Sequence, residues 1–225
     1  MKPTPVVLLL CLSSLLGVPR SEAGCRGVCG AVVAPTNAVT VALTPVEKRH
    51  LLLMQDEEKL ARDVYHVFAE TWELRSFVNI GTRSEPAHIA AITGLLQRHQ
   101  AEGTPQPAGA GEFRSPRMKK LYDSLVQAGS VSALDALKVA VEIEELDIKD
   151  LREGAARTRN EEIKAVYANL EAASVRHLNA FLFNLKARNG AYTPKHLDEK
   201  TFNGLIRDET AQAPAPVGRR GTRGG

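Results

Sequence analysis

Residues 44–68 read TPVEKRHLLLMQDEEKLARDVYHVF, and this stretch predicts a long helix that is buried along one face. Thr44 and Glu47 form a capping box at its start. Apolar side chains then recur every three or four residues to about Trp72, which is the period of one helix face. A single carboxylate interrupts this stripe, at Glu58. The stripe consists of Leu51, Met54, Glu58, Ala61, Tyr65 and Phe68.

A second segment places Glu85 and His88 on one helix face, because residues three apart lie side by side on a helix. Its start is open between two alternatives. The helix begins either at Ser84 or near Phe77, and in the second case Pro86 kinks it.

Two further long helices repeat the pattern of an apolar face that carries a polar group. The third helix is capped by Ser132 and carries Glu144, and the fourth runs from Glu161 to about Arg188 and carries His177. The face of the third helix is Leu137, Val141, Glu144, Ile148 and Leu151. The face of the fourth is Ile163, Tyr167, Leu170, Ser174, His177, Phe181 and Leu185.

Glycine- and proline-rich segments connect these helices. Residues 101–115 predict a loop, and a short helix follows from residue 115 to residue 129. Residues 154–160 predict a second loop, and Thr193-Pro194 predicts the start of one more short helix. The sequence therefore predicts an all-α fold with four long helices.

The two ends of the chain differ from its helical body, residues 44–207. Residues 1–23 predict a cleaved export signal, with an uncleaved anchor as the alternative, because a positive start precedes an apolar run too short for a comfortable membrane span. Residues 24–43 predict a flexible linker and residues 208–225 a disordered tail. We therefore expect a secreted or periplasmic protein without a transmembrane span in its mature chain.

Cys25 and Cys29 are the cysteines that remain after cleavage of this signal. In an oxidising compartment they could form a local disulfide, and the alternative is two free thiols. A lipid on Cys25 is a third, weaker reading, because Glu22 stands where a lipobox has an aliphatic residue.

The composition restricts the class of protein. Hydrophobic residues make up 44% of the 225 residues, and 29 basic residues nearly balance 26 acidic ones for a net charge of +3. A chain of this length buries a large core, and its near-neutral charge argues against a nucleic-acid-binding protein.

The polar groups on the four apolar faces are the candidate metal ligands. They are Glu58, Glu85, His88, Glu144 and His177. Burying one unpaired carboxylate costs several kcal/mol, so three in one core require a positive partner. Carboxylates combined with imidazoles suit iron or manganese, and di-iron bundles use one Glu from each of two helices and Glu-x-x-His from the others. We expect one or two such ions.

Each of these groups also has a plainer interpretation. A Glu-x-x-His pair is common on solvated faces, and a shift of one residue would make Glu57 or Glu145 the buried carboxylate instead. His177 alone would be a core histidine that Glu144 satisfies by a hydrogen bond. The remaining histidines match no ligand pattern and are predicted to lie on the surface: His50, His66, His99 and His196.

Residues 43–207 resemble the bacterial and archaeal proteins grouped as domain of unknown function 2202, which belong to the ferritin-like superfamily. The strings that carry the resemblance are DEEKLARDVY at 56–65, SEPAH at 84–88, IEELDI at 143–148 and SVRHL at 174–178. Glu58, Glu85, His88, Glu144 and His177 are also similar in position to ligands of the rubrerythrins. The resemblance implies a ferritin-like four-helix bundle with a long crossover between the second and third helices.

The chain departs from the rubrerythrin pattern at three points. Ser174 stands where the last Glu-x-x-His pair would have its glutamate, and Pro86 lies inside the second motif. There is also no four-cysteine module for electron transfer. The expected function is an exported metal-binding protein with oxidase or peroxide chemistry. Its expected partners are metal ions, and a second copy of the chain in a homodimer is a further possibility. The alternative is a metal-free helical binding or structural module of the cell envelope.

Overall fold

The computed structural model describes residues 42–206, and this part of the chain is helical without β-strands, so the predicted all-α class is confirmed. The predictions for residues 1–23, for residues 24–41 of the linker with Cys25 and Cys29, and for residues 208–225 lie outside the described residues. The elements are α1 (Pro45–Trp72), α2 (Arg75–Asn79), the π-helical turn η1 (Ile80–Ser84), α3 (Glu85–Arg98), α4 (Pro116–Gly129), α5 (Ala133–Arg157), α6 (Glu161–Lys186) and α7 (Glu199–Leu205).

Helix α1 begins with the predicted capping box. The Thr44 hydroxyl accepts a hydrogen bond from the backbone N–H of Glu47, and the Glu47 carboxylate accepts one from the backbone N–H of Thr44. This exchange satisfies two of the N–H groups that every helix start leaves unpaired. The helix ends at Trp72, as predicted, and Glu73 closes it in a left-handed conformation.

The second long helix begins well before Ser84 and contains a π turn. Helical backbone runs from Arg75 through η1 into α3, so the start near Phe77 is the better of the two sequence interpretations. The distortion is a wide turn ahead of Pro86, in which the backbone N–H of Glu85 bonds the carbonyl of Ile80 five residues earlier. A proline has no N–H and its ring clashes with the carbonyl four residues back, and a wider turn relieves that clash.

Helix α4 and the loop before it, residues 99–115, are tied to a polar face of α1. The Lys59 ammonium contacts Asp63 at 2.5 Å and donates to the carbonyl of Gly109 at 2.9 Å. Asp63 in turn accepts from the backbone N–H of Gly111 at 3.0 Å. Both charged side chains are buried, with exposures of 2% for Lys59 and 1% for Asp63. These bonds fix the loop against α1 and so position α4.

The C-terminal half differs from the prediction at two places. Helix α5 continues through Gly154 to Arg157, whereas a loop was predicted from residue 154. A Cβ at residue 154 would lie 2.6 Å from Cε2 of Tyr167, so this glycine allows α6 to pack closely rather than ending the helix. The last helix starts at Glu199 and not at Thr193-Pro194, because the Asp198 side chain caps it there.

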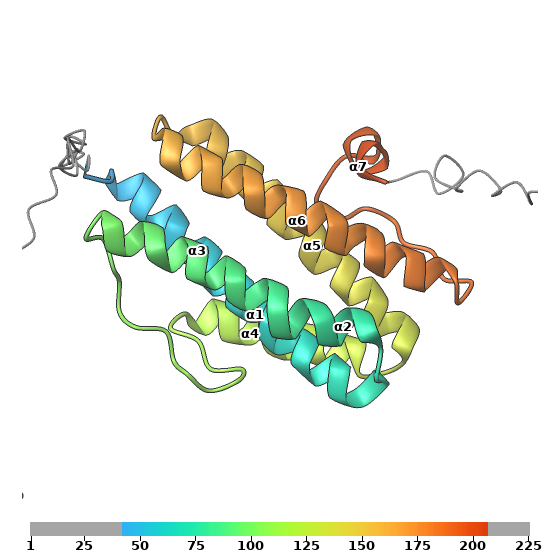
Figure 1. The fold of residues 1–225 in the computed structure, drawn as a ribbon. Helices are drawn as coiled ribbons and strands as arrows, with labels where there is room; N and C mark the ends of the chain where they lie inside the picture. The colour runs from blue at the N-terminus through green and yellow to red at the C-terminus, as the bar shows by residue number, and fades with distance from the viewer. Residues whose placement is uncertain (1–41, 207–225) are drawn as a thin grey trace, which may run out of the picture. The chain divides into compact units, whose positions relative to one another are not determined.

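Figure 1 shows how the long helices pair. Helices α5 and α6 lie alongside each other over their length and run in opposite directions, joined by a short turn. Helix α1 contacts α3 and α5, and α3 also contacts α6. Helix α4 packs on α1 and α5. The faces of α1, α3, α5 and α6 therefore meet in one shared interior.

This interior contains two apolar clusters with a polar layer between them. One cluster includes Tyr65, Phe77 and Phe181, and the other includes Leu51 and Leu95. Every residue of the stripes on the four long helices is buried as the sequence predicts, including the polar ones. In the part of the chain that the structure describes, no helix is both long and apolar enough to cross a membrane.

Candidate metal centre

The five predicted ligands meet in the polar layer between the two apolar clusters. Helix α1 contributes Glu58, α3 contributes Glu85 and His88, α5 contributes Glu144 and α6 contributes His177. The three carboxylates are each 2% exposed, and the histidines are 7% and 8% exposed. The sequence prediction that these groups are buried together is therefore correct, and Glu57 and Glu145 do not replace their neighbours in this layer.

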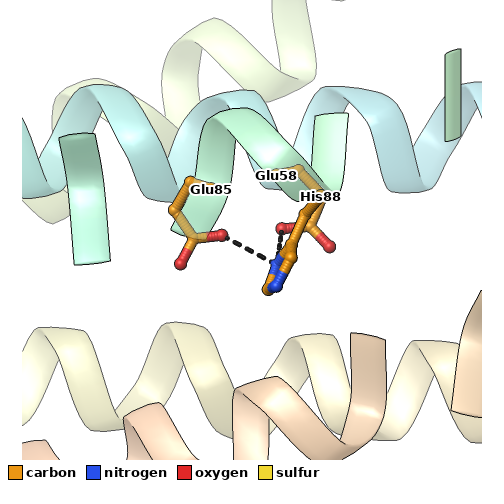
Figure 2. A group of neighbouring side chains, drawn as sticks. All are labelled: Glu58, Glu85 and His88. Carbon is orange, nitrogen blue, oxygen red and sulfur yellow. Dashed lines mark hydrogen bonds and ion pairs between the residues drawn. The ribbon is translucent and has the colours of Figure 1, made fainter. Parts of the chain in front are cut away.

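Glu58, Glu85 and His88 form the first triad, shown in Figure 2. Nδ1 of His88 lies 3.1 Å from Oε2 of Glu58 and 3.2 Å from Oε2 of Glu85. The carboxylates approach the imidazole from two different helices, α1 and α3. One nitrogen and two carboxylate oxygens, all within 4.8 Å of one another, thus converge from three side chains.

Glu85, Glu144 and His177 form the second triad. Nδ1 of His177 lies 3.2 Å from Oε1 of Glu85 and 3.4 Å from Oε2 of Glu144. Glu85 therefore belongs to both triads and presents one oxygen to each histidine. Because each of its oxygens faces a different histidine, Glu85 could contribute a ligand atom to each triad.

Several oxygen and nitrogen atoms of the layer that could bind a metal are buried without a hydrogen-bond partner. They are Oε1 of Glu58, Oε1 of Glu85, Oδ1 of Asp147 and Nδ1 of His177. Nδ1 of His177 and Oε1 of Glu85 are close enough for an ion pair, but they lack hydrogen-bond geometry. Buried polar atoms are nearly always paired, so unpaired ones at the meeting point of two triads fit metal ligands.

Two hydroxyl groups hold the ligands in place. The Tyr65 hydroxyl donates a 2.6 Å hydrogen bond to Oε1 of Glu144. The Ser84 hydroxyl lies 2.8 Å from Nε2 of His177 and 3.4 Å from Nε2 of His88, so it contacts both rings on the side opposite to Nδ1. The two imidazoles stack with their centroids 5.5 Å apart. Ser84 ends the π turn, which brings its hydroxyl between the histidines.

Asp147 is a member of this layer that the sequence analysis missed. It is 8% exposed, and its Oδ2 accepts a 2.6 Å hydrogen bond from the hydroxyl of Ser174 on α6. The signal was present in the sequence, because Asp147 follows Glu144 by three residues and therefore shares its helix face. Ser174, which stands where the sequence comparison expected a glutamate, thus presents a hydroxyl that donates to a carboxylate from α5.

The charged groups of the layer shift one another's pKa values. Burial alone would raise the pKa of Glu85, but the contacts with His177 and His88 outweigh it and lower this pKa to about 2. Burial alone would lower the pKa of His88, but Glu58 and Glu85 raise it to about 11. The pKa of His177 rises against burial to about 9, mainly because of Glu144. Without a metal ion, cationic imidazoles are thus favoured beside the ionised Glu85.

The pKa values of the other three carboxyl groups of the layer are raised and not lowered. Burial raises the pKa of Glu58 well above its usual value, and the charge of Asp147 adds to this effect. Burial also raises the pKa of Glu144, and that of Asp147 to about 7. Three carboxyl groups in one layer therefore resist ionisation, and a bound cation would favour their ionised forms.

The prediction that the remaining histidines lie on the surface was only partly correct, because all four are of intermediate exposure. The side chain of His99 is only 3% exposed and lies against Glu162. Nδ1 of His50 lies 2.9 Å from the Tyr167 hydroxyl. All four make contacts within the protein and are partly buried: His50, His66, His99 and His196. None belongs to a triad among the described residues.

Comparisons with known proteins agree with the fold and with one of the resemblances noted from the sequence. The uncharacterized protein MJ0754 of Methanocaldococcus jannaschii is 39% identical over 164 residues, which are 73% of this chain and 88% of that protein. The crystal structure of hypothetical protein MJ0754 matches with a TM-score of 0.71 at 38% identity, covering 74% of this chain and 94% of that one. The family model described as uncharacterized protein domain DUF2202 matches residues 47–209. The chain therefore belongs to the DUF2202 family.

Proposed function

We propose that this chain is an exported, ferritin-like metal protein that binds iron or manganese in the polar layer between α1, α3, α5 and α6. The observation that carries the proposal is the pair of buried triads that share Glu85. Their unpaired buried atoms include one oxygen of Glu58 and Nδ1 of His177. Hard carboxylate oxygens combined with imidazole nitrogens favour these metals over softer ones.

The helix arrangement supports the ferritin-like part of the proposal. Helices α1 and α3 form one pair and α5 and α6 the other, and residues 99–132, which contain α4, connect the pairs. A long connection of this kind between two helix pairs is typical of ferritin-like bundles. In those bundles the metal ligands project inward from all four helices, as the five candidate ligands do here.

Each triad would hold one cation, and Glu85 would contact both. Glu58 and Glu144 would neutralise the charge from opposite sides, while His88 and His177 would supply the nitrogen ligands. Iron bound by these residues would supply redox chemistry with dioxygen or peroxide. Tyr65 and Ser84 would orient Glu144 and the two imidazoles, which fixes the geometry of the ligands before a metal arrives.

Export is proposed from the sequence of residues 1–23. The positive start, the apolar run and the small residues before Gly24 have the order of a cleaved signal. Cleavage would release the helical body into the periplasm or the medium, and a lipid on Cys25 would instead tether it. N-terminal sequencing of the processed protein distinguishes these forms, because a lipidated Cys25 blocks the new end.

A metal-free binding or structural module is the second candidate. Direct contacts between the charged groups favour it, since both imidazoles already lie within 3.4 Å of carboxylates. In that case the layer would be a buried network of ion pairs, retained for specificity of packing. The unpaired atoms of the layer argue against this candidate.

Elemental analysis of the mature protein, purified from its native compartment without chelators, is the direct test. The proposal expects iron or manganese, with up to one ion per triad. Glu85→Gln should remove the metal because it alters both triads. The control Glu70→Gln, at an exposed position of α1, should leave the metal content unchanged. If the native protein contains neither metal and takes up none when Fe(II) is added anaerobically, the metal-free module is correct.

A further inference from the structure

His50 of α1 and Tyr167 of α6 form a hydrogen-bonded pair beside the apolar cluster that contains Leu51 and Leu95. Nδ1 of His50 lies 2.9 Å from the Tyr167 hydroxyl, and the two ring centroids are 5.5 Å apart. The tyrosine is 2% exposed, whereas the histidine is partly exposed. Within residues 42–206 the Tyr167 hydroxyl has no other hydrogen-bond partner.

A third helix holds the two rings in place. A Cβ at Gly154 of α5 would lie 2.4 Å from Cε1 of His50 and 2.6 Å from Cε2 of Tyr167. Both rings therefore rest against the backbone of α5, in space that exists because residue 154 has no side chain. The pair is thus built where α1, α5 and α6 meet, and its two polar atoms have little freedom to separate.

The protonation states of the two rings define the direction of the hydrogen bond. Burial lowers the pKa of His50, so its imidazole is mostly neutral near pH 7. Burial raises the pKa of Tyr167, so the phenol keeps its proton. A buried phenol O–H requires an acceptor, and a nitrogen of a neutral imidazole supplies one. Tyr167 therefore donates its proton towards Nδ1 of His50.

The charged groups around the pair act differently on its two possible ions. They are Glu47 and Glu57 on α1 and Asp150, Glu153 and Arg157 on α5. The carboxyl groups of α5 favour an imidazolium at His50, which only the arginine opposes. The carboxyl groups of α1 disfavour a phenolate at Tyr167. Loss of the proton alone is therefore unfavourable, whereas loss of a proton together with an electron leaves the tyrosine uncharged.

We propose that Tyr167 is a one-electron donor whose oxidation is coupled to proton transfer to His50. The electron leaves the phenol ring for the oxidant, the phenolic O–H bond breaks, and the proton forms an N–H bond at Nδ1. A neutral tyrosyl radical then lies beside an imidazolium, and reduction reverses both transfers. The physiological role rests on the proposed function, because the oxidant would be an iron centre that has reacted with dioxygen or peroxide.

The pair lies apart from the candidate ligands but within the same bundle. His50 precedes Glu58 on α1 and Tyr167 precedes His177 on α6, and a rise of 1.5 Å per residue gives a separation of about 12–15 Å. An electron can cross such a distance through packed protein, whereas a proton requires the local acceptor that His50 provides. Tyr65 is nearer to the centre, but its hydroxyl donates to the candidate ligand Glu144. Oxidation of Tyr167 would leave the ligands undisturbed.

Flash oxidation of the full mature chain without metal tests the coupled transfer directly. Photogenerated tris(bipyridine)ruthenium(III) is the one-electron oxidant, and absorption and electron paramagnetic resonance detect tyrosyl radicals. Tyr167→Phe should remove the long-lived radical. Tyr122→Phe makes the same change at a partly buried tyrosine of α4 and should leave that radical unchanged. A radical signal that persists unaltered in Tyr167→Phe overturns the proposal.

The proton acceptor is tested by His50→Gln. This variant should slow formation of the Tyr167 radical by about 100-fold or more, as loss of a positioned base does, and should abolish its solvent deuterium isotope effect. His66→Gln is the matched control, since that partly buried imidazole of α1 lies 3.1 Å from the Gly81 carbonyl instead. An unchanged rate in folded His50→Gln contradicts the proposal. Should that variant not fold, the wild-type radical decides, because its oxygen must show one exchangeable hydrogen-bonded proton.

The link to the metal centre is tested in the iron-loaded protein. Hydrogen peroxide should produce a radical that is absent from Tyr167→Phe, while Tyr167→Phe and His50→Gln should bind Mn(II) as tightly as the wild type. If the wild type binds neither Fe(II) nor Mn(II) but the flash experiment succeeds, the proposed function fails and the donor pair stands. If metal binds and the flash radical does not depend on Tyr167, only this inference fails. If peroxide produces no Tyr167 radical in the loaded protein, its role as a donor to the centre is refuted.

Discussion

The hydroxyl of Ser174 on α6 donates a 2.6 Å hydrogen bond to Oδ2 of Asp147 on α5, inside the layer of candidate ligands. Ser174 is 1% exposed, and the other oxygen of Asp147 is buried without a hydrogen-bond partner. A carboxyl group from α5 thus lies beside Ser174 of α6 in this layer. Ser174 fixes its orientation.

This relationship predicts that the carboxylate can be moved between the two helices. Asp147→Asn should weaken binding of Mn(II) by about 10–100-fold, as the loss of a group that supports a metal site does. In the double variant Asp147→Asn with Ser174→Glu, the new carboxylate on α6 should restore much of that affinity. Calorimetric titration with Mn(II) measures both effects.

The single variant Ser174→Glu provides the control for this exchange. It places a second carboxylate beside Asp147, so the metal-free protein should lose roughly 3 kcal/mol or more of stability to urea, because a buried charge without a partner is that unfavourable. Added Mn(II) should recover part of the loss. A double variant that binds no better than Asp147→Asn alone would show that the site has no place for a carboxylate from α6.

The fold was largely predictable from the period of apolar residues. The stripes through Glu58 and Glu144 are buried throughout, because a strong 3.6-residue period on a long helix leaves few alternatives. The errors lie at helix ends and turns. The sequence predicts a helix end at Gly154, but this glycine permits a close approach of Tyr167. Such an approach depends on which helix packs opposite.

The candidate ligands were predictable because each interrupts an apolar stripe, and Asp147 and Ser84 were missed because neither does so clearly. Asp147 lies three residues after Glu144, at the edge of the same face, where a solvated side chain is the usual outcome. Ser84 contacts the imidazoles only because the π turn before Pro86 rotates it inward. A turn of that kind accommodates the ring of the proline that follows it, and hydrophobic periodicity does not report it.

Ser84→Ala tests the role of this hydroxyl. Removing it frees Nε2 of His177 from its 2.8 Å contact and leaves the imidazole less well oriented, so metal affinity should fall by about 10–100-fold while the fold persists. Ser124→Ala is the matched control, because that exposed hydroxyl on α4 bonds only the carbonyl of Lys120. Mn(II) titration of both variants measures the difference, and equal affinities would mean that Ser84 does not orient the ligands.

The raised pKa of Asp147 predicts how the stability of the metal-free protein depends on pH. Burial raises this pKa from 3.8 to about 7, so between these values the folded protein keeps a proton that the unfolded chain has released. The contribution is fully present below the lower value, and the free energy of unfolding should fall as pH rises through the window. The raised pKa of His177, about 9, continues the decline above pH 6.5.

Urea unfolding in the presence of a chelator measures this dependence, and Asp147→Asn isolates its source. The variant cannot ionise at this position, so its stability should decline less steeply than that of the wild type between about pH 4.5 and pH 6.5. Saturating Mn(II) should reverse the trend in the wild type, since metal binding favours the ionised carboxylate. Parallel pH curves for the two metal-free proteins would assign the slope to other groups.

A pair of glycine substitutions tests the packing that holds α4 in place. A Cβ at Gly129 would lie 2.0 Å from Cζ of Phe68, whose side chain is fully buried. Gly129→Ala should therefore destabilise the protein to urea by about 1–3 kcal/mol, as overpacking of a core does. Gly204→Ala is the matched control, because a Cβ there meets nothing within 4 Å and lies in α7, where alanine favours helix by about 0.5–1 kcal/mol. Replacing glycine by alanine should thus lower the stability at residue 129 and raise it at residue 204. If Gly129→Ala is as stable as the wild type, α4 is not seated against Phe68.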